Sequence, residues 1–296
     1  MSISQLTRSS LSNMSILLTG GSGKTAPRVA ALLAADKKPY LLGSRHGPGA
    51  GSNGHPTVKF DMSDESTWME PFKNTQIKAV YMMEPRISEP WVPMNKFVEL
   101  AKKQGVNRFV LCAGTSAVIG KDGMGRVWEH LIKSGVDYCV LRPSWFMENL
   151  IEPGLAFTIG KLNKVFTATQ DGKIPFISAD DIAGVAYHAL TDEKSYNCDL
   201  RVLGPENLTY DQIAETLSKV LGRKIEHVKL DEAGRIDGLV QVGLSDYFAR
   251  FLTRLEVLAS QDFEKGTSDA VERVTGHPPK SFEKFAEENK AVWSSN

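Results

Sequence analysis

The chain contains 296 residues, of which 42% are hydrophobic and 24% charged, and its 35 basic side chains equal its 35 acidic ones in number. This length accommodates one large α/β domain, or a nucleotide-binding domain with a smaller lobe. The even charge argues against the basic surface that nucleic-acid and anionic-membrane binders carry. We therefore expect a small-molecule ligand, and neither a nucleic-acid nor a membrane partner.

The cysteine pattern and the N-terminal sequence indicate the cellular compartment of the protein. Cys112, Cys139 and Cys198 are an odd number without metal-ligand spacing, which predicts reduced thiols and no metal site. Residues 1–13 lack the hydrophobic core of a secretory signal, and no apolar run has the length of a membrane span. We expect a cytoplasmic protein. An organelle transit peptide is the alternative, because Asp36 is the first acidic residue.

The most informative stretch is an apolar run that ends in a glycine-rich turn and continues as a predicted helix over residues 24–35. Its pattern Gly20-x-x-Gly23-x-x-Ala26 matches a dinucleotide-binding fingerprint in which a small residue replaces the last glycine. A P-loop is excluded because the glycine that it requires five residues before Gly23 is Leu18. A plain tight turn remains the alternative. The predicted phosphate contacts are Thr19, Gly20, Gly21, Ser22, Gly23, Lys24 and Thr25.

The second predicted strand, residues 40–43, ends in Ser44 and Arg45. In a dinucleotide fold an acid at this position binds the ribose hydroxyl of NAD, whereas an arginine accommodates the 2′-phosphate of NADP. The sequence therefore favours NADP, with an ordinary exposed arginine as the alternative. After a third strand over residues 58–60, Asp61 is predicted either to bind the adenine amino group or to begin a turn.

The residues between these two strands are too rich in glycine and proline to form a stable helix. We expect residues 46–56 to form a surface loop. A lid over the adenosine phosphate is the alternative.

Strands and helices alternate through the first half of the chain. Further strands are predicted over residues 77–83, 109–113 and 138–141, and further helices over residues 64–72, 91–104 and 124–134. This alternation predicts an α/β fold with a Rossmann-like, doubly wound parallel sheet. Ligands bind at the carboxyl ends of such strands. The residues at those ends that we predict to contact the cofactor are Met83, Glu84, Ala113 and Pro143.

The pattern is looser in the second half. Residues 144–149 follow the sixth strand with aromatic and polar side chains, and we predict that they face the substrate. The elements expected next are a strand over residues 173–177, a helix over 178–190, a strand over 201–204, and a helix that Thr209 and Gln212 cap and that ends at Gly222.

From Asp231 onward the chain reads as helical. In that part Tyr247, Phe248 and Phe251 form either a packing face or a part of the substrate pocket. The sequence thus predicts three regions: an N-terminal extension (residues 1–14), an NADP-binding Rossmann-like domain (15–150), and a mixed region (151–296). We expect the mixed region to return to the sheet edge and to form a smaller, mostly helical substrate-binding lobe.

The proton donor expected of this fold is missing from the sequence. An NADP-binding sheet suggests a short-chain dehydrogenase/reductase, whose usual members use a Tyr-x-x-x-Lys pair, yet none of the seven tyrosines precedes a lysine at that spacing. General acid catalysis contributes about 10²–10⁴-fold, so a ketone substrate is disfavoured. Either the protein binds the dinucleotide without turnover, or its substrate needs no strong acid. An iminium carbon fits the second case, because its nitrogen already carries the charge and hydride delivery depends on proximity.

Longer motifs point to a particular family. They read Gly-Gly-x-Gly-Lys-Thr at 20–25, Leu-Arg-Pro-x-Trp-Phe-Met-Glu-Asn at 141–149, Asp-Gly-Lys-Ile-Pro-Phe-Ile-Ser-Ala-Asp-Asp-Ile-Ala at 171–183 and Leu-Gly-Pro-Glu at 203–206. With these motifs the chain resembles the NmrA-like, atypical short-chain reductases of fungal ergot-alkaloid biosynthesis, the festuclavine and agroclavine dehydrogenases, from about Ser15 to Trp293.

This resemblance implies NADPH-dependent reduction of a tetracyclic iminium, formed from a secondary amine and an aldehyde, to a tertiary amine. Members of the family often carry arginine where this chain has Ser22, which shifts the expected phosphate contacts toward Lys24, Ser44 and Arg45. An imine or iminium reductase outside the ergot pathway is a further possibility.

Three functional hypotheses follow. The first is an NADPH-dependent iminium reductase in which aromatic faces hold a cationic amine, with Glu84 or Glu148 adding charge attraction unless either is an ordinary surface carboxylate. The second is an NmrA-like sensor that binds NADP(H) and relays its state to a protein partner. The third is a reductase of quinones or enones. Each is compatible with a homodimer. The substrate-side candidates of the first are Trp91, Trp145, Phe146, Met147, Glu148 and Tyr247.

Overall fold

The computed structural model describes residues 14–47, 49 and 54–294, and it divides into two compact units. Unit 1 comprises Met1–Pro143 and Ile182–Arg201, and unit 2 comprises Ser144–Asp181 and Val202–Asn296. The predicted N-terminal extension, apart from Met14, and residues 48 and 50–53 of the predicted surface loop lie outside the described residues.

Unit 1 is built on a seven-stranded sheet with the order β3-β2-β1-β4-β5-β6-β8. The pairs β1–β2, β2–β3, β1–β4, β4–β5 and β5–β6 are all parallel. The order of the strands reverses between β1 and β4, which is the point at which open α/β sheets bind ligands. The prediction of a doubly wound parallel sheet is therefore confirmed. The strands are β1 (Met14–Leu18), β2 (Tyr40–Ser44), β3 (Thr57–Lys59), β4 (Gln76–Met83), β5 (Arg108–Cys112), β6 (Asp137–Pro143) and β8 (Cys198–Val202).

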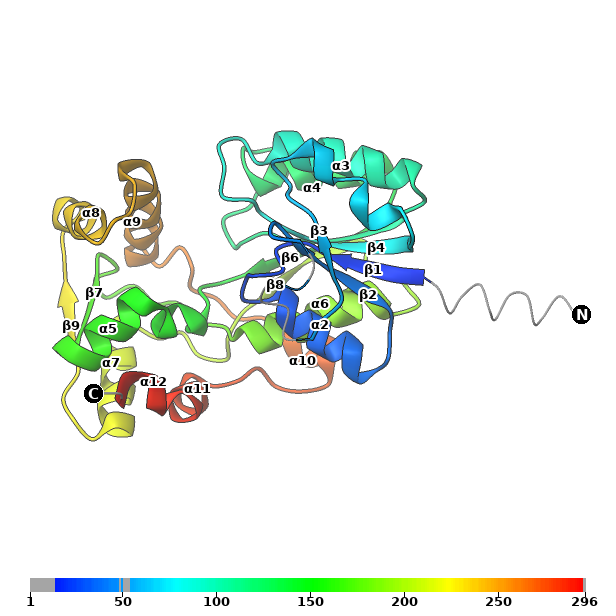
Figure 1. The fold of residues 1–296 in the computed structure, drawn as a ribbon. Helices are drawn as coiled ribbons and strands as arrows, with labels where there is room; N and C mark the ends of the chain where they lie inside the picture. Colours follow the sequence, from blue (N-terminus) through cyan, green and yellow to red (C-terminus); the bar gives the residue numbers. More distant parts are fainter. Residues whose placement is uncertain (1–13, 48, 50–53, 295–296) are drawn as a thin grey trace, which may run out of the picture. The chain divides into compact units, whose positions relative to one another are not determined.

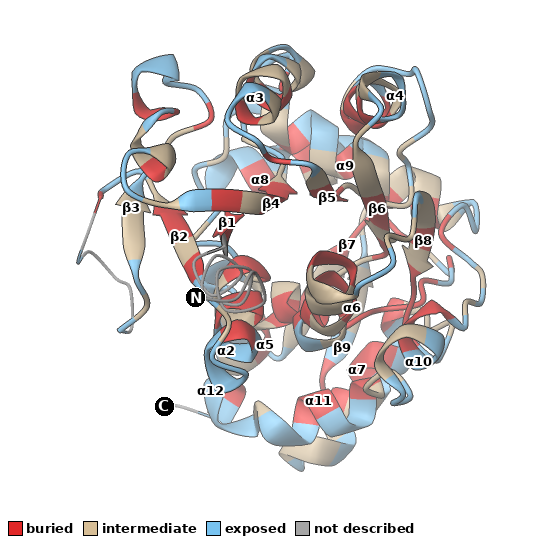
Figure 2. Ribbon diagram, turned by 90° about the vertical axis from the view of Figure 1, so that its right-hand side faces the viewer, coloured by how far each residue is buried: buried red, intermediate tan, exposed pale blue. Residues whose placement is uncertain are grey.

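Helices cover both faces of this sheet. α3 (Trp91–Lys103) and α4 (Met124–Ser134) lie on one face, and α2 (Ala26–Ala35) and α6 (Ala179–Thr191) lie on the other (Figures 1 and 2). The central strands are accordingly buried on both sides, which explains why they read as continuous apolar runs in the sequence. The core on the α3 and α4 side includes Leu17, Val80, Met82, Phe97, Phe109, Leu111, Val127, Leu131 and Val140.

Two predicted elements are wrong. The helix expected over residues 64–72 is replaced by two short 3₁₀ helices, η1 (Glu65–Thr67) and η2 (Glu70–Phe72), because Asp64 caps a single turn and Pro71 lies in the first turn of another. The strand expected over residues 173–177 consists of two isolated bridges, Ile174 with Leu208 and Phe146 with Ile177. Pro175 interrupts any ladder there, since it has no N–H to donate.

Unit 2 contains a two-stranded parallel sheet that the sequence did not predict, formed by β7 (Lys164–Thr167) and β9 (Glu226–Lys229). The largest buried side chains packed near it include Phe176, Phe282 and Trp293. The capping box predicted at Thr209 is confirmed. The elements around this core are η3 (Met147–Ile151), α5 (Pro153–Leu162), α7 (Tyr210–Leu221), α10 (Ala270–Thr275), α11 (Phe282–Glu288) and α12 (Lys290–Ser294).

The helical character predicted after Asp231 is also confirmed. α8 (Glu232–Gln241) and α9 (Asp246–Ser260) pack against each other around a small hydrophobic cluster of their own. A bidentate ion pair joins the guanidinium of Arg235 to the buried carboxylate of Glu256, which also accepts a hydrogen bond of 2.7 Å from the Ala168 N–H. This pair ties the helical hairpin to the strand segment of unit 2.

Two general features concern the described residues alone. Within residues 14–47, 49 and 54–294, no helix combines the length and hydropathy needed to cross a membrane. In the same part of the chain, no group of three or more His, Cys, Asp or Glu side chains is placed to hold a metal ion.

Candidate active site

The glycine turn joins β1 to α2 at the strand-order reversal of unit 1. Gly20 has a φ of 74°, a conformation that favours glycine, and the Gly23 N–H donates to its carbonyl at 2.8 Å. Gly21 packs against β2: a Cβ added there would lie 2.6 Å from the carbonyl oxygen of Gly43. The backbone geometry therefore requires glycine at positions 20 and 21. The turn that they form exposes main-chain atoms in the place where a phosphate would bind.

The two threonines that flank this turn point into the protein. The Oγ1 of Thr19 accepts a hydrogen bond of 3.0 Å from the Met83 N–H, and the Oγ1 of Thr25 lies 2.8 Å from the phenol oxygen of Tyr81. Both threonines are buried. Thr25 is the N-cap residue of α2, yet its side chain makes no capping hydrogen bond. The N-terminus of α2 is thus left without the side-chain cap that threonine commonly supplies.

The outer side of the turn carries polar and basic groups. Ser22 and Gly23 are exposed, and Lys24 is partly exposed. Arg28 lies in the first turn of α2 and donates to the carbonyl of Lys24 at 2.5 Å. Arg28 was not among the cofactor contacts predicted from the sequence. A cation in the first turn of a helix is electrostatically disfavoured unless a negative charge lies nearby.

The predicted selectivity residues lie at the end of β2. Ser44 is the last residue of the strand, and its carbonyl accepts from the Phe60 N–H at 2.9 Å. Arg45 is exposed and makes no hydrogen bond or ion pair with the described residues. Asp61 begins a turn, because its carboxylate accepts from the N–H and hydroxyl of Ser63 at 2.9 and 2.6 Å.

The remaining predicted cofactor contacts lie at the carboxyl ends of the central strands. Met83 ends β4 and Glu84 follows it, open to solvent, although desolvation by the surrounding protein raises the pKa of this carboxyl. The Ala113 N–H extends the ladder between β5 and β6 by donating to Leu141 at 2.9 Å. Pro143 is buried at the end of β6.

Trp91, the first residue of α3, is partly buried, and the guanidinium carbon of Arg126 lies 4.9 Å from its ring centroid. Trp91 therefore already has a cationic partner within unit 1. The two residues line a hollow of about 310 Å³ together with Asn95, Gly120, Glu129, His130 and Lys133.

The predicted substrate segment belongs to unit 2, and much of it is used in folding. Met147 is 1% exposed and belongs to the hydrophobic core. Glu148 is 3% exposed, and its carboxylate accepts from the Ala179 N–H at 2.9 Å, at the N-terminus of α6. It is not an ordinary surface carboxylate. Trp145 and Phe146 are partly buried, with the Trp145 ring 6.3 Å from that of Tyr210.

The aromatic side chains of α9 do not form a packing face. Tyr247 is 74% exposed and Phe251 is 46% exposed, and the Phe251 ring stacks on Phe248 at 6.0 Å. The buried side of the helix is instead made of small and polar residues, among them Ala249 and Thr253. Tyr247 and Phe251 are therefore exposed within unit 2.

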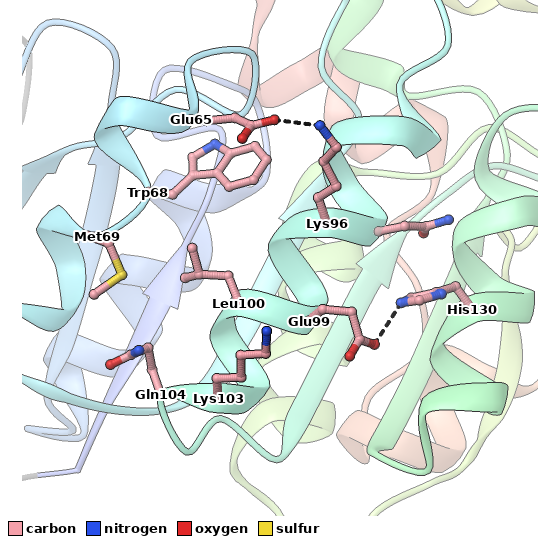
Figure 3. Close-up of a pocket in the computed structure, with 10 residues that line it drawn as sticks. Glu65, Trp68, Met69, Lys96, Glu99, Leu100, Lys103, Gln104 and His130 are labelled. Carbon is pink, nitrogen blue, oxygen red and sulfur yellow. Dashed lines mark hydrogen bonds and ion pairs between the residues drawn. The ribbon is translucent and has the colours of Figure 1, made fainter.

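A hollow of about 610 Å³ lies elsewhere in unit 1, along α3 and η1 (Figure 3). Lys96 bonds to Glu65 at 2.8 Å, and the Nε2 of His130 lies 3.0 Å from the carboxylate of Glu99. The hollow extends to Gln104, beyond the end of α3, and therefore to the sheet edge at which the strands begin. Because its lining includes no residue of the glycine turn and none of the predicted cofactor contacts, we do not assign this hollow to the cofactor.

Together, a parallel sheet whose order reverses at β1 and a glycine turn that leads into a helix without a side-chain cap define a Rossmann-type α/β fold. The chain belongs to the NmrA-like family, whose model matches residues 12–237. The resemblance predicted from the sequence motifs is confirmed.

The chain is also similar to individual proteins over nearly its full length. Festuclavine synthase II of Penicillium roqueforti is 41% identical over 289 residues, which cover 95% of this chain and 100% of that protein. Agroclavine dehydrogenase of Claviceps fusiformis is 40% identical over 295 residues, covering 95% and 99%. The structure of Citrobacter sp. triphenylmethane reductase complexed with NADP(H) shares the fold, with a TM-score of 0.79 at 18% identity over 93% of this chain and 99% of that one.

Proposed function

We propose that the protein is an NADPH-dependent reductase that transfers hydride to the C=N bond of an alkaloid-type iminium. The observation that carries this proposal is the relationship, at about 40% identity over 95% of the chain, to a festuclavine synthase and an agroclavine dehydrogenase. The missing Tyr-x-x-x-Lys pair supports the same conclusion, because an iminium carbon accepts hydride without a proton donor.

The residues of the glycine turn fit a dinucleotide. Gly21 lets the turn pack directly against β2, the N-terminus of α2 has no side-chain cap, and Arg28 places positive charge beside the turn. In this proposal the main chain from Gly20 to Lys24 holds the pyrophosphate, and Ser44 and Arg45 hold the 2′-phosphate. NADPH would supply the hydride.

The substrate side of the proposal rests on aromatic side chains. Trp145, Phe146 and Tyr247 are at least partly exposed within unit 2, and aromatic faces attract cationic amines by about 0.5–2 kcal/mol. Of the two carboxylates predicted to attract the amine, Glu148 is committed to the N-terminus of α6, and the role of Glu84 in unit 1 stays a prediction. The protein's contribution to catalysis is then to orient the iminium and to exclude water.

The test is NADPH consumption with a preformed N-methyl dihydroisoquinolinium salt, compared with a ketone, an enone and a quinone of similar size. We expect turnover with the iminium at least tenfold above that with the ketone, since only the ketone needs a proton in the transition state. NADPH binding without consumption of any acceptor would favour the sensor hypothesis. Preferential reduction of the quinone or enone would keep the enzyme class and change the acceptor.

A further inference from the structure

The buried surroundings of the glycine turn contain a tyrosine with no role in the proposed reaction. Tyr81 lies in β4, next to β1, and none of its surface is exposed. It contacts both ends of the turn: its carbonyl accepts from the Thr19 N–H at 2.9 Å, and its phenol oxygen lies 2.8 Å from the hydroxyl of Thr25. The two residues are 56 positions apart in the chain, so this contact exists only in the folded protein.

The contact explains an irregularity at the start of α2. A threonine at an N-cap commonly adopts an extended backbone and accepts a hydrogen bond from the second or third helical N–H. Thr25 instead has φ −99° and ψ −43°, which are close to helical values, and its hydroxyl makes no capping bond. The hydroxyl is directed into the core, where Tyr81 and the sulfur of Met83, at 3.5 Å, are its neighbours.

An N-cap side chain and a bound phosphate compete for the same N–H groups at the end of a helix. We infer that Tyr81 is a positioning residue for the cofactor: by engaging the Thr25 hydroxyl, it leaves the N-terminus of α2 open to the pyrophosphate. This inference rests on the proposed NADPH site. Burial raises the pKa of Tyr81 well above its ordinary value, so the phenol keeps its proton and remains a hydrogen-bonding partner at neutral pH.

The first variant is Tyr81→Phe, which keeps the ring and removes the hydroxyl. We expect the Kd for NADPH, measured by fluorescence titration, to rise about tenfold, because the Thr25 hydroxyl loses its partner at 2.8 Å, keeps only the Met83 sulfur at 3.5 Å, and turns to the helix end. The Kd for NADH rises by the same factor, since the pyrophosphate is common to both cofactors. The ratio of the two constants is therefore unchanged.

The decisive comparison is the double variant Tyr81→Phe with Thr25→Val. If Tyr81 acts by withholding the Thr25 hydroxyl, removal of that hydroxyl should recover most of the lost affinity, so the double variant binds NADPH more tightly than Tyr81→Phe alone. It also leaves no hydroxyl unpaired, which protects its fold. Tyr40→Phe is the matched control, because Tyr40 is a buried tyrosine at the amino end of β2, away from the turn.

The outcomes are distinguishable. Wild-type affinity in Tyr81→Phe, a double variant weaker than Tyr81→Phe, or an effect confined to NADPH would each contradict the inference. An equal loss in Tyr40→Phe would assign the effect to general stability, which thermal unfolding of all four proteins measures independently. Failure of the wild-type protein to bind either dinucleotide would instead overturn the proposed function itself.

Discussion

The segments that follow β1 and β6 differ in what they leave available to a ligand. After β1, Gly20 and Gly21 shape the main chain while the flanking threonines turn inward, so the backbone itself is presented. After β6, Met147 and Glu148 are buried and serve the core and the start of α6. A position beyond a strand end is therefore no guarantee of a functional side chain. Burial decides which of its groups can meet a ligand.

The largest effect expected from this comparison is that of Gly21→Ala. The added Cβ would lie 2.6 Å from the Gly43 carbonyl oxygen, and a backbone atom of a central strand cannot move away easily. We expect the Kd for NADPH to rise at least about a hundredfold, equivalent to roughly 2.7 kcal/mol. Gly154→Ala is the control, because a Cβ there meets nothing within 4 Å. Unchanged affinity in Gly21→Ala would show that the turn does not hold the cofactor.

The second expected effect concerns stability and comes from Glu148→Ala. This change removes the acceptor of the Ala179 N–H and leaves a cavity, so we expect unfolding to be easier by roughly 2–4 kcal/mol and Tm to fall. Glu148→Gln keeps an acceptor and should lose about half as much. If Glu148→Ala instead keeps the wild-type free energy of unfolding and raises only the KM for the iminium, Glu148 contacts the substrate. The contrast between the segments after β1 and β6 would then be wrong.

The third effect concerns cofactor selectivity and comes from Arg45→Ala. A charge-assisted hydrogen bond is worth roughly 1.5–3 kcal/mol, so the preference for NADPH over NADH should fall by about one to two orders of magnitude in kcat/KM. Lys161→Ala is the control for loss of an exposed positive charge, since Lys161 lies in α5 of unit 2. A preference that survives Arg45→Ala would assign the 2′-phosphate to another residue.

The sheet of unit 1 was predictable because its strands are short, apolar and separated by helices of regular period. The glycine turn was predictable for a related reason: Gly20 and Gly23 act through local backbone geometry, which sequence spacing records. The predicted cofactor contacts themselves remain predictions. What the sequence could not supply is the partner of each group, such as Tyr81 for Thr25, because that depends on contacts distant in the chain.

Unit 2 was harder to predict for physical reasons. β7 and β9 have only four residues each and lie about sixty positions apart, so neither has a periodic signal strong enough to identify a strand. Around Pro175 the error was the reverse, a predicted strand that does not form. The apolar residues there suggested a strand, but Pro175 has no N–H to donate to a ladder. The buried Glu148 could not be told from a surface carboxylate, because its main-chain partner Ala179 lies 31 positions away in the sequence.

The smallest effect expected is that of Tyr247→Leu, which tests whether the aromatic face of α9 binds the substrate. A leucine keeps the hydrophobic character and removes the π face, so we expect the KM for the iminium to rise about three- to fivefold, with kcat and the Kd for NADPH unchanged. Phe263→Leu is the matched control, because Phe263 is also an exposed aromatic residue of unit 2, half of its surface being accessible. An equal change in both variants would mean that exposed aromatic residues affect the protein generally. If the KM rises in Tyr247→Leu alone, and does not rise when a neutral enone replaces the iminium, α9 recognises the charge of the substrate. The exposed α9 would then bind the substrate, whereas the buried segment after β6 serves the fold.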